Sequence, residues 1–130
     1  MKAILSEIES KIIPGTRIPK PRARAEFVVK GWGMRRSERA LIYTIPNHKN
    51  WTMPYEKGVA LSEFSQAFDH LTQMGSFTRS WLTQSMPPCA KEGGCNFTTI
   101  GGIFEFLGYA TYDHGRYHYV GSLGTRSGQD

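Results

Sequence analysis

The stretch Asn96 to Val120, NFTTIGGIFEFLGYATYDHGRYHYV, decides the fold. Its first half carries apolar residues at i, i+3, i+4 and i+7, namely Ile100, Ile103, Phe104 and Leu107. That spacing predicts a helix with one buried face, and Gly108 stands where a helix commonly ends. The second half is rich in aromatic and β-branched residues around His114-Gly115, which predicts a hairpin with Tyr112 opposite Tyr117. We therefore expect a helix followed at once by a two-stranded hairpin.

Two further helices are predicted before this stretch. Residues Ser62 to Met74 have the same apolar spacing, with Ser62 as the N-cap and Gly75 as the stop. Thr78 is the expected cap of a second helix over Arg79 to Met86. Three helices followed by a hairpin is the element order of a winged helix-turn-helix, so residues 59–120 resemble that fold.

The N-terminal part predicts other elements. Residues 1–13 favour an amphipathic helix, and residues 14–25 a basic, proline-containing arm that is extended and has no core. Residues 26–33 and 39–45 read as two strands of a hairpin joined by MRRSE, and the second strand is apolar on both alternating faces, as a central strand is.

The predicted fold class is therefore α+β. A winged-helix-like unit of three helices and a β-hairpin packs with an N-terminal β-hairpin in a single domain over residues 26–120. Residues 121–130 are expected to form a disordered tail.

Positive charge is concentrated in one part of the chain. The net charge is +5, and eight of the sixteen Lys and Arg residues lie between Arg17 and Arg39, against two acids, Glu26 and Glu38. This segment carries +6, and the rest of the chain sums to −1. Clustered positive charge is the electrostatic footprint of proteins that bind nucleic acid.

Fold and charge together predict a small accessory or regulatory protein that binds nucleic acid. Phosphate contacts are expected from five arginines: Arg22, Arg24, Arg35, Arg36 and Arg116. Asn96, Thr98 and Thr99 open the third helix and are expected nearest to the bases. That helix has no basic residue, and its Gly101-Gly102 pair predicts close approach of another helix or strand. The hypothesis depends on whether the basic segment and the start of this helix share one face.

Two other functions stay open. A protein-interaction module, in the simplest case a homodimer, would use the N-terminal helix and the apolar or glycine-lined surface of the third helix. A small-ligand-binding regulatory domain would need an aromatic pocket.

Patterns for catalysis and metal binding are weak. Cys89, Cys95, His114 and His118 follow a Cys-Cys-His-His order, but one histidine lies at a turn and the other on a strand, so we expect no zinc and reduced thiols. The sequence has no glycine-rich phosphate loop and no nucleophile in a known frame, which predicts no enzyme activity and no cofactor. It has no apolar run of about 18 residues and no secretory signal, so we expect a cytoplasmic location without a membrane partner.

Two strings, KGWGMRRSERALIYTIPN (30–47) and CNFTTIGGIFEFLG (95–108), resemble those of a family of small bacterial proteins carried on mobile gene cassettes of integrons. The resemblance spans residues 14–110 and implies a bacterial accessory protein, without an activity to carry over. The chain departs from a winged helix in its long PPCAKEGGC segment (87–95), which replaces a tight turn, and in its non-basic third helix.

Overall fold

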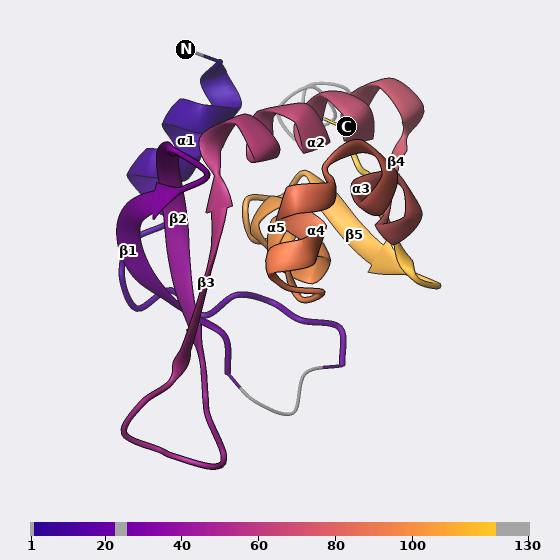
Figure 1. Cartoon of the computed structure of the whole chain (residues 1–130). Helices are drawn as coiled ribbons and strands as arrows, with labels where there is room; N and C mark the ends of the chain where they lie inside the picture. The colour runs from indigo at the N-terminus through magenta and orange to yellow at the C-terminus, as the bar shows by residue number, and fades with distance from the viewer. Residues whose placement is uncertain (1, 23–25, 122–130) are drawn as a thin grey trace.

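A computed structural model describes residues 2–22 and 26–121 of the chain. Within these residues the protein is a mixed α+β structure with five helices and two three-stranded antiparallel sheets. The elements in chain order are α1 (Ala3–Lys11), β1 (Val28–Arg35), β2 (Glu38–Ile45), β3 (Tyr55–Ala60), α2 (Leu61–Met74), β4 (Ser76–Thr78), α3 (Arg79–Ser85), α4 (Pro87–Glu92), α5 (Asn96–Phe106), β5 (Ala110–Asp113) and β6 (Arg116–Tyr119). Figure 1 shows the first sheet on one side, α3 to α5 on the other, and α2 lying across the top.

The first sheet has the order β1-β2-β3. β2 is its central strand, as its apolar pattern predicts, and residues 40–43 are buried. The turn before β2 is shorter than predicted, because only Arg36 and Ser37 lie outside the strands, with positive φ values of 53° and 63°. Two consecutive residues in this region make a tight hairpin turn that matches the right-handed twist of the strands. MRRSE conceals that turn because it contains neither glycine nor asparagine.

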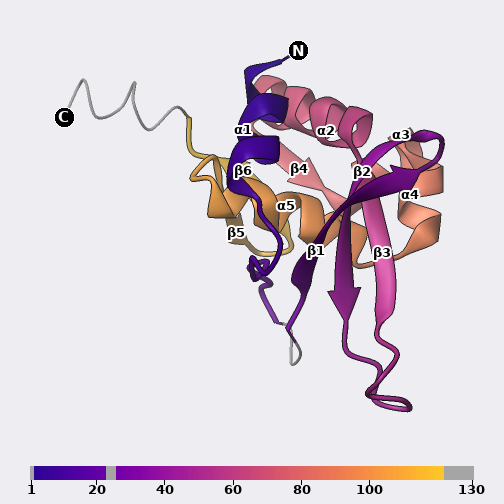
Figure 2. The same cartoon turned by 90° about the vertical axis from the view of Figure 1, so that its left-hand side faces the viewer.

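The third strand of this sheet is not predicted by the sequence. The first half of β3 is polar, and Gly58 interrupts its apolar end. The fold requires glycine there, since a Cβ at Gly58 would stand 2.6 Å from Cγ of Arg35 and 2.9 Å from Cδ1 of Ile42. Both views show the loop between β2 and β3 projecting away from the body (Figures 1 and 2).

The second sheet has the order β4-β6-β5. The predicted hairpin is confirmed, with Tyr112 opposite Tyr117 and Ala110 opposite Tyr119. β4 is only three residues long and follows directly after α2, so no sequence period signals it. It pairs with β6 and ties the end of α2 to the hairpin.

The helix boundaries confirm some predicted signals and correct others. Gly75 ends α2 in the left-handed conformation (φ 83°), and the Thr78 hydroxyl accepts a hydrogen bond from the Trp81 amide at the start of α3. The predicted N-cap Ser62 is wrong. Ala60 occupies that position, and its amide donates to the Glu63 carboxylate at 2.8 Å, as in half of a capping box.

Residues 87–92, at the start of the long PPCAKEGGC segment, form the short helix α4, which the sequence does not predict. Proline suits the first turn of a helix because the amides there have no partner within the helix. The same prolines therefore end α3 and begin α4.

One core joins the two sheets and the helices. Its fully buried members come from every part of the chain, including Ile8, Leu41, Phe64, Phe77, Ile100 and Tyr117. Close approach at the two glycines of α5 is confirmed. A Cβ at Gly101 would stand 2.1 Å from the Tyr117 ring, and one at Gly102 would stand 2.3 Å from the carbonyl oxygen of Pro19.

The sequence predicted an arm without a core, and the structure corrects this prediction. Ile18 is buried, its amide donates to the carbonyl of Phe27, and the Pro19 backbone lies on Gly102. The arm pairs with the residues that lead into β1, through an isolated bridge between Arg17 and Val28. The proline content of the arm did not reveal that its chain packs against α5.

Candidate functional site

A hollow lies beside the start of α5. We call it the α5 pocket; its volume is about 490 Å³. It is lined by parts of the arm, the β2–β3 region, α3, α5 and β5: Lys20, Pro21, Arg22, Phe27, Ile45, Pro46, His48, Tyr55, Arg79, Thr98 and Tyr112. Its walls are mainly apolar and aromatic, and its polar groups are mainly cationic. The arm and the start of the third predicted helix therefore share one face.

Lys20 fastens the arm to α5. Its ammonium group donates to the carbonyl of Cys95 at 3.1 Å and to the hydroxyls of Thr98 at 2.9 Å and Thr99 at 2.8 Å. An ammonium group has three hydrogens, so these three acceptors use all of them. The same nitrogen lies 4.1 Å from the centroid of the Phe27 ring, a favourable cation–π geometry.

Burial lowers the pKa of Lys20 to about 7, and the positive charge of Arg79 acts in the same direction. Neither of these effects is offset by a carboxylate, because no ion pair of Lys20 exists within the described residues. An anion in the α5 pocket would supply the missing countercharge and favour the protonated form.

Two exposed arginines flank this half-buried lysine. Arg22 comes from the arm, and Arg79 is the first residue of α3. Arg79 donates through Nη1 to the carbonyl of Gly94 at 2.6 Å, and its guanidinium carbon lies 4.9 Å from the centroid of Phe97. No acidic residue lines the pocket, and within residues 2–22 and 26–121 neither arginine has an ion pair.

The start of α5 supplies only one of the three polar side chains expected near the bases. Thr98 lines the pocket, whereas Asn96 and Thr99 are fully buried. The Asn96 amide accepts from the Tyr43 hydroxyl at 2.6 Å and donates to the carbonyl of Cys89 at 2.8 Å. Asn96 thus holds α5 against the first sheet and α4, and Thr99 accepts from Lys20 of the arm. Neither side chain is positioned to contact a base.

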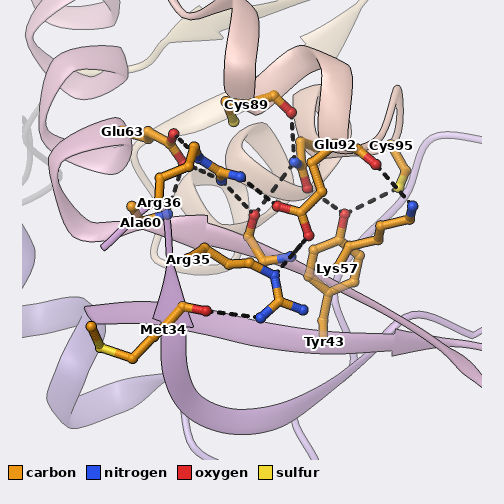
Figure 3. Close-up of polar contacts among 12 residues, drawn as sticks. Met34, Arg35, Arg36, Tyr43, Lys57, Ala60, Glu63, Cys89, Glu92 and Cys95 are labelled. Atoms are coloured by element: carbon orange, nitrogen blue, oxygen red, sulfur yellow. Dashed lines mark hydrogen bonds and ion pairs between the residues drawn. The ribbon is translucent and has the colours of Figure 1, made fainter. Parts of the chain in front are cut away.

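Arg35 and Arg36 lie away from the pocket, in what we call the hairpin-turn network with Glu63 and Glu92 (Figure 3). Arg36 binds Glu63 through Nε at 2.6 Å and Nη2 at 2.8 Å, and Glu92 through Nη1 at 2.5 Å. Arg35 binds the other oxygen of Glu92 at 2.9 Å. Both carboxylates also accept backbone amides, from Ala60 and Gly58.

Electrostatics in this network favour the charged forms. Although burial raises the pKa of Glu92, hydrogen bonds from Arg36 and Arg35 outweigh it and leave the pKa lowered. The hydrogen bonds that Arg36 donates to Glu63 and Glu92 raise the pKa of Arg36. The two predicted phosphate contacts from this turn are thus engaged in joining β1, α2 and α4.

The remaining predicted contacts are Arg24 and Arg116. Arg24 lies outside the described residues. Arg116 is exposed at the start of β6, opposite Thr78 in one pairing and Asp113 in the other. Asp113 also contacts Nδ1 of His114 at 2.7 Å, so the hairpin tip carries an acid beside Arg116.

The surfaces named for a protein partner are largely used within the chain. α1 buries Ile4 and Ile8 in the core, and the glycine face of α5 is covered by Tyr117 and Pro19. Cys89 and Cys95 are free thiols. Within the described ranges, no three His, Cys, Asp or Glu side chains are grouped as a metal site requires, and no helix has the length and apolar character of a membrane span.

Several residues of the pocket could not be predicted from the sequence. In the sequence Lys20 belongs to a charged run, Arg79 and Tyr112 belong to a predicted helix and a predicted hairpin, and nothing in the sequence singles out Tyr55. Residues so far apart in sequence meet only because the arm crosses α5 between the β2–β3 region and β5. A local signal did exist in the Gly101-Gly102 pair, which marks the place where the arm lies.

Neither protein-family models, nor curated proteins, nor solved structures give a match to this chain.

Proposed function

We propose that the chain binds nucleic acid through the face that carries the α5 pocket, and that residues 61–119 are a winged helix-turn-helix unit. The observation that carries the proposal is that Lys20 and Arg22 of the arm meet the start of α5 in a cationic hollow to which the described residues bring no carboxylate. Phosphate groups are the anions that such a surface most commonly attracts in nucleic-acid-binding proteins.

The order of elements supports the winged-helix part of the proposal. Helices α2, α3 with α4, and α5 are followed by the β5–β6 hairpin, and β4 joins that hairpin as β4-β6-β5. The way of binding differs from groove reading by a recognition helix. α5 is buried on almost every side, so the contacts are expected from Arg22, Arg79, Thr98 and Arg116.

The experiment is a fluorescence anisotropy titration of labelled single-stranded and duplex DNA and RNA of mixed sequence, starting at about 50 mM salt. We expect binding that weakens steeply as salt rises. The double variant Arg22→Ala/Arg79→Met should weaken it by at least about tenfold and reduce the salt slope, because two phosphate contacts are lost.

Lys11→Ala is the matched control. It removes one positive charge from α1, where Lys11 is exposed and paired with Glu7, and it should leave binding unchanged. Absence of binding to every one of these nucleic acids at low salt would overturn the proposal.

A second candidate, a small-ligand-binding regulatory domain, is favoured by the size of the pocket. A volume of about 490 Å³ lies within the range of small-molecule sites, and an apolar wall with few polar groups is typical of them. A thermal-shift screen of mononucleotides and aromatic carboxylates tests it. A saturable rise in melting temperature that Arg79→Met abolishes would favour this candidate.

A further inference from the structure

We propose that the α5 pocket takes up a single unstacked base, so that the protein binds single-stranded nucleic acid in preference to duplex. The inference rests on the proposed function and names the form of nucleic acid that the site accepts. Three observations support the inference: the shape of the site, its aromatic walls and the different roles of its cations.

The shape of the site is the first step. The cationic face is hollow, and the element that a winged helix would place in a groove, α5, lies buried beneath it. A duplex presents stacked bases in its interior and offers only its backbone to a hollow surface. An unpaired base can leave its stack and enter a pocket.

The walls of the pocket suit the faces of a base. Phe27, Tyr55 and Tyr112 come from three separate parts of the chain and line one hollow, together with Pro21 and Pro46. Tyr55 is half exposed, so its ring is accessible to a ligand at the mouth. Bases bind single-strand proteins by stacking on such rings, with little dependence on sequence.

The cations divide into two roles. Arg22 and Arg79 are exposed, so their guanidinium groups can reach phosphates on either side of the inserted base. Lys20 cannot donate to a ligand while its three hydrogens are held by Cys95, Thr98 and Thr99, so it contributes charge and keeps the arm in place.

The preference of the pocket for one base over another should be weak, because its polar side chains are largely engaged within the protein. The Thr98 hydroxyl accepts from Lys20 and lies 3.2 Å from the carbonyl of Cys95, to which it donates. Its one hydrogen is therefore used within the protein and it can act toward a ligand only as an acceptor. Among the described residues, no side-chain amide lines the pocket to read a base edge.

The experiment compares four labelled ligands: an oligothymidylate of about sixteen nucleotides, its fully abasic analogue, the corresponding duplex and thymidine monophosphate. We expect the oligothymidylate to bind about tenfold more tightly than the abasic strand and the duplex, because only it offers free bases. Oligomers of adenine or cytosine should bind within a few-fold of it.

Tyr55→Leu should remove most of the advantage of the oligothymidylate and leave the abasic strand unchanged, whereas Arg22→Ala should weaken both equally. Phe106→Leu is the matched control, since Phe106 is as exposed as Tyr55 (49% and 50%) and lies at the other end of α5. It should change neither affinity.

Equal binding of the abasic strand, duplex and oligothymidylate would overturn this inference and leave nucleic-acid binding standing. Binding of the monophosphate as tight as that of the oligomer would also overturn it, in favour of a small ligand. Failure of every strand to bind would remove the proposed function itself, and the inference with it.

Discussion

Two groups of cations in this protein have opposite environments. In the hairpin-turn network, Arg35 and Arg36 are matched by Glu63 and Glu92 at hydrogen-bond distance. In the α5 pocket no carboxylate among the described residues matches the lysine and the two arginines. Lys20 and Arg22 belong to the same basic stretch of sequence as Arg35 and Arg36. Charge counted along a chain therefore does not tell which cations stabilise the fold and which remain available to an anion.

The largest effect on stability is expected in the hairpin-turn network. Arg36→Met leaves Glu63 and Glu92 largely buried with fewer partners, and the free energy of unfolding should fall by about 3–5 kcal/mol. Urea unfolding measures it. Arg35→Ala is the control and should cost clearly less, because Glu92 keeps Arg36 and the Gly58 amide. Equal losses for the two variants would contradict the central place of Arg36.

A smaller effect is expected where the arm meets α5. In Gly102→Ala the new methyl group would collide with the carbonyl oxygen of Pro19, so we expect the free energy of unfolding to fall by about 1–3 kcal/mol. Without the arm, the same change should instead stabilise α5 by about 1 kcal/mol, because alanine is the better helix former. A gain in stability would show that the arm does not lie on α5 in solution.

The lysine of the pocket should make stability depend on pH. The pKa of Lys20 is about 7 in the fold, and about 10.4 is usual for an unfolded lysine. Between these values the unfolded chain holds a proton that the folded protein has released, so the free energy of unfolding rises with pH by at most about 1.4 kcal/mol per unit. Below pH 7 this contribution is constant.

Urea titrations at successive pH values from neutral upward measure this slope. Lys20→Met should remove it, and Lys11→Met, which changes an exposed lysine of α1, should retain it. An unchanged slope in Lys20→Met would mean that another group titrates. Affinity for nucleic acid should fall as pH rises through 7, because the buried charge is lost.

The smallest effect on stability is expected at Arg22. Arg22→Ala should change the free energy of unfolding by no more than about 0.5 kcal/mol, because the described residues give this exposed side chain no ion pair. We expect the Arg22→Ala substitution to affect the binding of nucleic acid instead. A loss well above that value would place Arg22 among the cations that hold the fold together.

The sequence predicted those elements whose pattern is local. The helix of residues 96–106, the glycine stop before β4 and the pairing of Tyr112 with Tyr117 depend on residues near one another in the chain. The sequence did not predict β3 and α4, because partners distant in sequence stabilise these elements against an unfavourable composition. The α5 pocket shows the same limit: Thr98 and Arg22 were named, but only the crossing of the arm brings them to Arg79 and Tyr112.

Asn96 has a consequence for how the molecule unfolds. Its side chain joins β2, through Tyr43, to the segment before α5, through the carbonyl of Cys89, and its nitrogen lies 3.4 Å from the carbonyl of Gly58 in β3. The hydrogen bonds of Asn96 thus connect the C-terminal helices to the N-terminal sheet. A gene fragment that encodes only residues 59–121 would leave this buried amide without its hydroxyl donor and α5 without its neighbouring strand. The intact chain is therefore expected to melt as a single cooperative body, and the C-terminal part is not expected to fold alone.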